Sequence, residues 1–168
     1  KGISTGTDQV TVSGLVSGDA LTSITLTQST NDATTSGEIK PSGAKTTKME
    51  NGGTYNYSFT YVKGNLTINP KPVTLTWGSG SLTYDGTAQK PTCSISSGVI
   101  SGTSCTVSVS GAQTKVGQDY TATATLSNSN YTISSNNQKS FSIAAKEVGL
   151  TWSNPNLTYN GNNQKPTC

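Results

Sequence analysis

Three cysteines are the most reactive side chains of this 168-residue chain, and their surroundings favour disulfide chemistry over catalysis. Cys93 and Cys105 flank a segment with two glycines, Ser94 to Ser104, that can turn and bring the two cysteines close together. A disulfide needs a Cα separation of roughly 5.5 Å. Cysteines in a chain this polar also fit an oxidising, extracellular setting. We therefore predict a Cys93–Cys105 disulfide, with free thiols at all three cysteines as the alternative.

The remaining side chains include few of the groups that catalysis needs. The chain has no histidine, so neither a Ser-His-Asp triad nor a Cys-His pair can be assembled. Its eight acidic residues are scattered, and most stand in turns rather than as a glycosidase-type pair. Three cysteines without histidine or a C-x-x-C spacing do not make a zinc site, and the clustered acids of a calcium loop are missing. We predict that the protein is not an enzyme and has no cofactor or metal.

Charge and hydropathy exclude two further classes of function. The eleven basic residues are all lysine and the formal net charge is +3, whereas nucleic-acid recognition relies on arginine and dense cationic patches. No apolar run approaches the roughly 18 residues of a membrane-spanning helix. We predict neither a nucleic-acid partner nor a membrane span in this segment.

The elements that must position these residues are predicted to be β-strands. Only 11% of the residues are charged and 30% are hydrophobic, and Thr, Ser, Asn and Gly are abundant. The low net charge and the period-two recurrence of Val, Ile, Thr and Tyr, as in Val73–Trp77 and Tyr120–Leu126, favour folded β-structure over disorder. Further short strands are expected at 82–84, 106–109, 131–133 and 141–143. About seven strands between turns such as Asp85-Gly86 indicate a small sandwich or open β-roll.

The last 23 residues repeat an internal segment. Lys71–Cys93 and Lys146–Cys168 align without a gap, 75 residues apart, and 14 of the 23 positions are identical. A fixed period of this size marks a tandem array in which each repeat is one folding unit. Cys168 occupies the position of Cys93, so its disulfide partner is expected in another molecule or further along a longer chain.

This period predicts three parts. Residues 1–70 form a β-module that lacks its first strands, residues 71–145 form a complete module, and residues 146–168 open a third. Neighbouring modules that brace one another would build an elongated rod.

The first module is longer than the second. Val10–Gly14 matches Val107–Gly111 at an offset of 97 residues, whereas Tyr57 matches Tyr131 at an offset of 74. The difference predicts an insertion between residues 15 and 56, in the form of a hairpin or long loop. Such an insertion is either a binding region or a neutral addition.

Aromatic and proline residues are expected in the module cores and joints. The recurring aromatic residues are Trp77, Tyr84, Trp152 and Tyr159. Their recurrence in successive modules favours core packing or a contact between modules over a sugar-stacking platform. Pro70 and Pro72 fix φ in the first joint and predict a semi-rigid spacer.

Several of these motifs resemble the MBG repeats of bacterial surface proteins. The run Tyr57–Ile68 followed by Pro70 is similar to the closing signature of those repeats, and Val12–Leu15 and Leu82–Gly86 are similar to their opening parts. The resemblance implies a mostly-β fold, grasp-like or immunoglobulin-like, strung in tandem within adhesins. The paired cysteines depart from that pattern, as do the residues Gln138–Ser140, where the pattern has a glycine.

The leading interpretation is a mechanical one. We expect the stalk or fibre region of an extracellular bacterial adhesin, whose partners are neighbouring modules or subunits of the same protein. One alternative is a subunit of a self-assembling filament completed by strand addition. Another is a module that binds a glycan or a protein on a host or cell surface through the 15–56 region.

Overall fold

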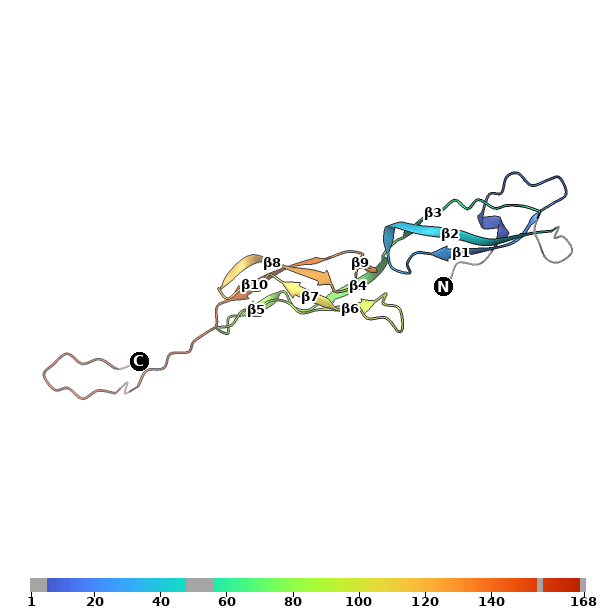
Figure 1. The fold of residues 1–168 in the computed structure, drawn as a ribbon. Helices are drawn as coiled ribbons and strands as arrows, with labels where there is room; N and C mark the ends of the chain where they lie inside the picture. The colour runs from blue at the N-terminus through green and yellow to red at the C-terminus, as the bar shows by residue number, and fades with distance from the viewer. Residues whose placement is uncertain (1–5, 48–55, 154–155, 167–168) are drawn as a thin grey trace. The chain divides into compact units, whose positions relative to one another are not determined.

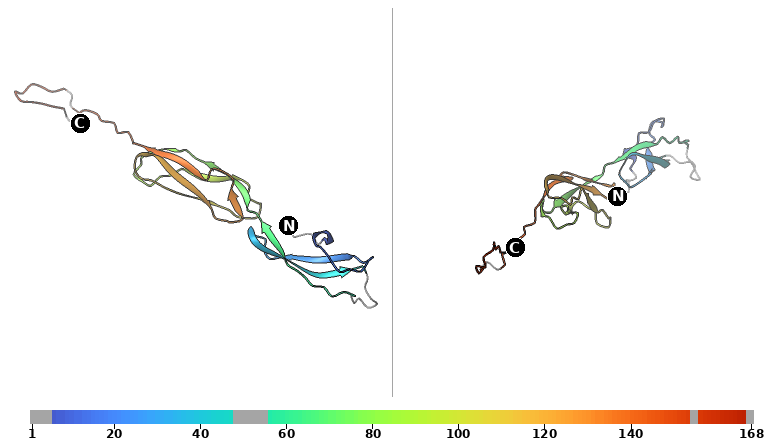
Figure 2. Two further views of the ribbon diagram at one scale, coloured as in Figure 1. Left: turned by 90° about the horizontal axis from the view of Figure 1, so that it is seen from above. Right: turned by 90° about the vertical axis from the view of Figure 1, so that its left-hand side faces the viewer.

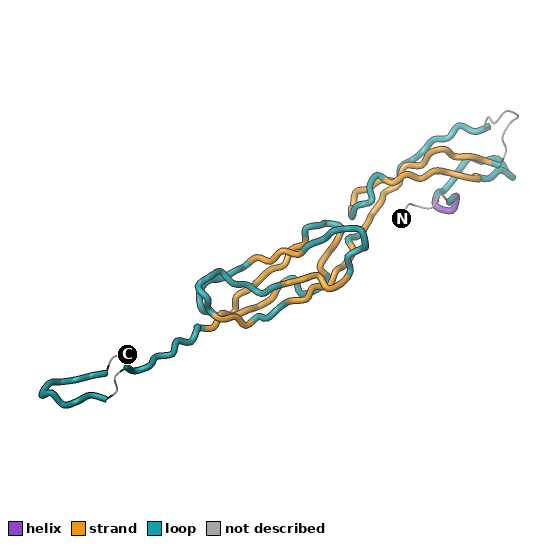
Figure 3. Tube along the Cα trace, turned by 90° about the horizontal axis from the view of Figure 1, so that it is seen from below, coloured by secondary structure: helices purple, strands orange, loops and turns teal. Residues whose placement is uncertain are grey.

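The structure, a computed structural model, describes residues 6–47, 56–153 and 156–166. In these ranges the chain consists almost entirely of strands and loops, with one 3-10 turn, η1 (Thr7–Gln9), as Figures 1 and 3 show. The strands are β1 (Leu21–Gln28), β2 (Thr34–Thr46), β3 (Gly64–Ile68), β4 (Lys71–Trp77), β5 (Ser81–Thr83), β6 (Cys93–Ser97), β7 (Val107–Ser110), β8 (Gly117–Leu126), β9 (Tyr131–Ile133) and β10 (Gln138–Ala144). The all-β class predicted from the period-two patterns is confirmed.

The chain divides into two compact units whose limits differ from the module limits expected from the repeat. Unit 1 contains residues Lys1–Thr74, Ile95–Thr106 and Leu126–Ser134. Unit 2 contains residues Leu75–Ser94, Val107–Thr125 and Ser135–Cys168. Strands β4, β6 and β8 therefore contribute residues to both units.

Unit 1 is built on a three-stranded antiparallel sheet in the order β1-β2-β3. Strands β1 and β2 form a long hairpin (Figure 2), in which Gln28 lies opposite Ile39 and Leu21 opposite Thr46. Ile24 of β1 is buried, because alternate side chains of a strand point to the same face.

This hairpin changes the interpretation of residues 15–56. The expected hairpin is present, but it supplies two of the three strands of the sheet and is not a peripheral addition. Residues 48–55 of the expected insertion lie outside the described residues. The strand expected at Val10–Gly14 is not formed, so its alignment with Val107–Gly111 is wrong.

A second ladder in unit 1 joins β4 to β9. The two strands are parallel, with Lys71 opposite Tyr131 and Val73 opposite Ile133. Val73 is 1% exposed and Tyr131 is 6% exposed, so the start of β4 is one of the best buried parts of the chain.

Unit 2 is built on a four-stranded sheet in the order β5-β10-β8-β7. Strand β10 pairs with β8 in antiparallel and with β5 in parallel orientation. One face of this sheet carries the core cluster of Ala122, Phe141 and Ile143, against which Trp77 and Leu82 pack. The alternation of small hydroxyl and apolar residues in β8 and β10 thus buries one face and exposes the other.

The strand pattern of residues 71–145 agrees with about seven short strands. It adds β6, which lies in the segment expected only to turn between Cys93 and Cys105. The parallel pairs β4–β9 and β5–β10 distinguish this arrangement from the immunoglobulin sandwich, whose sheets are antiparallel. Among the described residues, no helix is long and apolar enough to cross a membrane.

Candidate functional site

Two tyrosine hydroxyls in unit 1 hold two turns with the same geometry. The Tyr131 hydroxyl accepts a hydrogen bond from the backbone N–H of Ile100 at 3.1 Å, and it also bonds to the Thr103 hydroxyl. The Tyr57 hydroxyl likewise accepts from the N–H of Val16 at 3.2 Å, and it donates to the Asp19 carboxylate at 2.6 Å. Each tyrosine therefore fastens a turn that is remote in sequence.

The sequence carried a signal for these turns that the Val10–Gly14 alignment missed. Ser13–Asp19 reads S-G-L-V-S-G-D, and Ser97–Thr103 reads S-G-V-I-S-G-T, at an offset of 84 residues. The second glycine of each motif has a positive φ, 89° at Gly18 and 81° at Gly102, which a residue with a Cβ rarely adopts. Two glycines in fixed positions were a better guide to register than alternating Val and Ser.

Asn130 joins the tip of the β1–β2 hairpin to the turn that precedes β9. Its Oδ1 accepts a hydrogen bond from the Ala33 N–H at 2.6 Å, and its Nδ2 donates to the Asp32 carboxylate at 2.8 Å. Its backbone is fixed too, because its N–H donates to Asn128 Oδ1 and its carbonyl accepts from the Lys71 N–H at 2.8 Å. We call the contacts of Asn130 with Asp32 and Ala33 the Asn130 clamp.

A small hollow of about 220 Å³ lies beside the Asn130 clamp. Its polar lining includes Asn31, Asn69, Lys71, Thr103, Asn128 and Tyr131. Small-molecule sites usually measure about 300–1,000 Å³. The hollow is smaller, and the Asn130 amide on its wall is already engaged by the hairpin tip. The arrangement therefore suits a joint between chain segments better than a ligand site.

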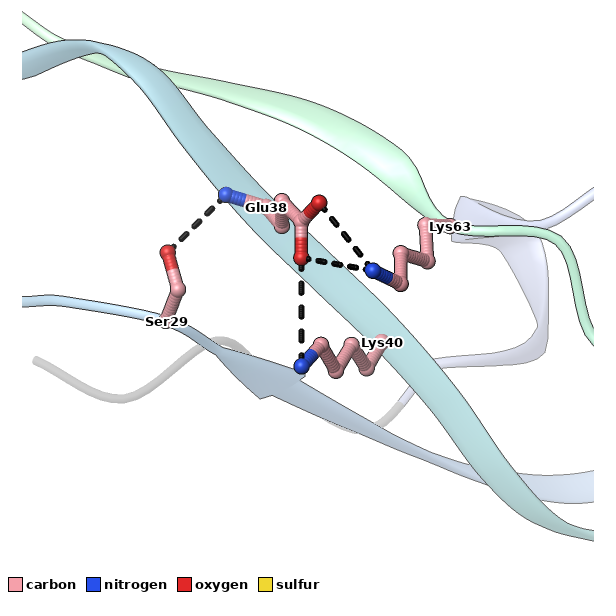
Figure 4. Close-up of polar contacts among 4 residues, drawn as sticks. All are labelled: Ser29, Glu38, Lys40 and Lys63. Carbon is pink, nitrogen blue, oxygen red and sulfur yellow. Dashed lines mark hydrogen bonds and ion pairs between the residues drawn. The ribbon is translucent and has the colours of Figure 1, made fainter.

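The most compact charged cluster in unit 1 is centred on Glu38 in β2 (Figure 4). Its carboxylate accepts from Lys63 Nζ, with N···O separations of 3.1 and 3.2 Å, and lies 3.8 Å from Lys40 Nζ. The Glu38 N–H donates to Ser29 Oγ at 2.9 Å, which ties β2 to the end of β1. The side chains are about half exposed, so these ion pairs contribute on the order of 0–1 kcal/mol. The cluster ties neighbouring segments of the sheet together, and it does not have the arrangement of a catalytic pair.

The structure does not contain the predicted disulfide: Cys93 and Cys105 are free thiols, both half-buried. Cys93 begins β6, in the sheet of β4 and β9, whereas Cys105 precedes β7 of the four-stranded sheet. Among the described strands, β6 and β7 belong to different sheets, so they are not paired at the short Cα separation that a disulfide needs. The pairing stays a prediction for the oxidised protein, and Cys168 lies outside the described residues.

The four repeated aromatic residues have different environments. Trp77 packs on the core cluster of unit 2, and its Nε1–H donates to the Asn136 carbonyl at 2.8 Å. Tyr84 is 42% exposed. Trp152 and Tyr159 are 65% and 91% exposed, because no strands equivalent to β9 and β10 cover them among the described residues. Their expected place in a module core or at a contact between modules stays a prediction.

The two prolines flank the start of β4. Pro70 immediately precedes β4, and Pro72 is the second residue of β4, opposite Thr132 of β9. Proline has a fixed φ and no N–H. Both residues therefore restrict the backbone between β3 and β4, and the semi-rigid spacer expected from the sequence stays a prediction.

The described part of the chain contains no group of three His, Cys, Asp or Glu side chains close enough to hold a metal ion. No family model matches this chain, and neither a curated protein nor a solved structure was found to be similar to it.

Proposed function

We propose that the chain is a stalk-forming repeat region of an extracellular bacterial adhesin or surface fibre, of the type represented by MBG repeats. Its work is mechanical: it holds other parts of the parent protein at a fixed distance. The partners of each module are then the neighbouring modules of the same protein, and no substrate is turned over.

The Asn130 clamp is the observation that carries this proposal. It connects the hairpin of residues 1–70 to a turn of residues 71–145 through two side-chain hydrogen bonds, in addition to the short peptide link. Each bond contributes about 0.5–1.5 kcal/mol, so bending at this joint costs roughly 1–3 kcal/mol. Pro70 and Pro72 oppose the same motion by restricting the backbone. A stiff joint is what a stalk requires and what a flexible tether lacks.

The ligand-binding alternative has less support. The hairpin tip at 30–33 is the loop that the sequence offered for specificity. Ala33 and Asp32 of this tip are bonded to Asn130. The adjoining hollow of about 220 Å³ is small for a glycan of several residues. These contacts favour a bracing role for the tip.

Small-angle scattering of the Asn130→Ala variant tests the proposal. We expect the variant to show a broader distribution of intramolecular distances than the wild-type chain, because both clamp bonds are lost. Asn160→Ala is the matched control, since it also removes an asparagine from a turn but lies far along the sequence from the joint. Equal distance distributions for Asn130→Ala and the wild type would count against a stiffened stalk.

A further inference from the structure

In the described part of the chain, the three strands of the unit 1 sheet match three of the four strands of the unit 2 sheet. In unit 2, β10 lies between β8 and β5, and in unit 1 the strand β3 pairs with β2 on one side only. The hairpins β1–β2 and β7–β8 correspond, because both are closed by the same reciprocal bonds. The Thr47 N–H donates to the Ala20 carbonyl, and the Ala20 N–H donates to the Thr47 hydroxyl. Ser127 and Thr106 make the same two bonds. Strand β3 therefore has the place of β10 without a counterpart of β5 among the described residues.

The two motifs Ser13–Asp19 and Ser97–Thr103 differ in what lies over their first glycine. A Cβ built on Gly98 would lie 2.6 Å from the Pro72 carbonyl oxygen and 2.9 Å from the Val73 Cα, so β4 passes directly over this glycine. A Cβ built on Gly14, the equivalent residue, meets no atom within 4 Å. Among the described residues, no strand occupies the place over Gly14 that corresponds to β4.

Apolar side chains around these two places are incompletely covered. Tyr131, Phe141 and Ile143 are 6%, 3% and 1% exposed. Their counterparts Tyr57, Leu66 and Ile68 are only half-buried. We call the edge of β3 with Gly14 and Tyr57 the open seat.

The chain also carries an exposed copy of the strands that would fill such a seat. Lys146–Trp152 is the copy of β4, and Asn156–Thr158 is the copy of β5. Val148, Leu150 and Leu157 are 80%, 78% and 47% exposed, whereas Val73 of β4 is 1% exposed. Unpaired strand edges and exposed apolar residues of matching spacing favour strand addition.

We propose that Lys146–Trp152 and Asn156–Thr158 of one copy of this chain bind the open seat of a second copy, head to tail. The register follows from the internal module: Leu157 lies opposite Ile68, as Leu82 lies opposite Ile143, and Val148 takes the place that Val73 has in the ladder with β9. The proposal rests on the proposed function as a stalk of repeat modules. It adds that the strands of one molecule can complete a module of another molecule. Assembly of this kind extends the stalk into a fibre.

Sedimentation velocity over a hundredfold range of protein concentration tests this inference, because association between molecules depends on concentration. We expect the average sedimentation coefficient to rise with concentration. Leu157→Asp places a charge on the docking face and should raise the dissociation constant at least about tenfold. Thr158→Asp is the matched control, because its counterpart Thr83 in β5 is exposed, and it should leave association nearly unchanged.

The receiving side is tested with Gly14→Asn. Asparagine tolerates the positive φ of 85° at this position, and its side chain occupies the path of the incoming strand. Gly86→Asn is the control, since Gly86 has the same φ of 85° and equally open surroundings. We expect Gly14→Asn alone to weaken association.

Two outcomes would overturn the inference. One is a wild-type chain that stays monomeric at every concentration, and the other is association that neither Leu157→Asp nor Gly14→Asn weakens. Scattering of the Asn130→Ala and wild-type sequences in a Leu157→Asp background tests the stiff joint in the monomer. A failure of the stalk proposal is thus separable from a failure of this one.

Discussion

Segments 71–93 and 146–168 have closely related sequences and very different environments in this structure. In the first, Val73 is 1% exposed and Trp77 packs on a core cluster. In the second, Val148 is 80% exposed and Trp152 is 65% exposed. The residues 71–77 form β4, whereas the described residues of the second segment form no strand. Sequence identity at the apolar positions therefore did not suffice to make the same structure.

The difference identifies what a strand of this module needs. Strand β4 is paired with β9, and β5 is paired with β10, and the paired residues lie 60 or 61 positions further along the sequence. Burial of a Val or Leu side chain stabilises by about 1.5–3 kcal/mol, but only when a second layer covers it. Segment 146–168 has the apolar residues, but no second layer covers Val148, Leu150 or Trp152 in the described part of the chain.

The largest expected effect is a difference between the two tryptophans. Trp77→Ala removes a ring from the core cluster and a hydrogen bond to the Asn136 carbonyl. It should lower the free energy of unfolding by about 2–4 kcal/mol. Trp152→Ala should change it by less than about 0.5 kcal/mol in dilute solution. Urea unfolding followed by circular dichroism measures both, and equal losses would show that Trp152 is also packed.

A smaller effect concerns the thiol that ends the first segment. Burial raises the pKa of the Cys93 thiol above its ordinary value of 9.0, so less thiolate is present near neutral pH. We expect alkylation of Cys93 to be slower in the native protein than in urea. Intact-mass analysis with reductant present should find Cys93 and Cys105 both alkylatable, as in this structure. Without reductant, the predicted disulfide should lower the native mass by two hydrogens and protect both thiols, and two alkylatable thiols in the unreduced protein would contradict it.

The smallest expected effect is on the pH dependence of stability, and it comes from the one charged residue that distinguishes the Asp85-Gly86 turn from the Asn160-Gly161 turn. The Thr87 N–H, helped by the Thr87 hydroxyl, holds the pKa of Asp85 below its ordinary value of 3.8. A lowered pKa stabilises the fold above the unfolded-state pKa, and this contribution is lost as pH falls through the folded-state pKa. Asp85→Asn converts the turn to that of the second copy, Asn160, which does not titrate.

Thermal unfolding as a function of pH measures this contribution. The wild-type chain should lose slightly more stability than Asp85→Asn as the pH is lowered below about 4. Parallel curves for the two proteins would mean that the Asp85 turn is not closed by its carboxylate.

The sequence predicted several parts of the fold and missed others for identifiable reasons. The period-two runs located β4, β8, β9 and β10 closely because alternation is a local property of the chain. The alternation of Val10–Gly14 misled the alignment, since the structure has no strand there and β1 takes the corresponding place in the sheet. The Asn130 clamp could not be predicted, because it joins residues 97 and 98 positions apart.

The two turns show what the sequence determined by itself. Asp85 Oδ1 accepts from the Thr87 N–H at 2.8 Å, and Asn160 Oδ1 accepts from the Asn162 N–H at 3.1 Å. Gly86 and Gly161 have φ values of 85° and 80°. Glutamine side chains also bridge six residues back in both copies, at 2.9 and 2.7 Å.

Only the tertiary structure decided whether the residues before each turn become strands. Every bond of these turns spans at most six residues, so the entropy of closing it is small and both copies form it. The ladders of β4 and β5 join residues 60 or 61 positions apart. Such pairing becomes favourable only when distant partners and a shared core are present. Lys71–Trp77 has both, whereas Lys146–Trp152 has neither among the described residues.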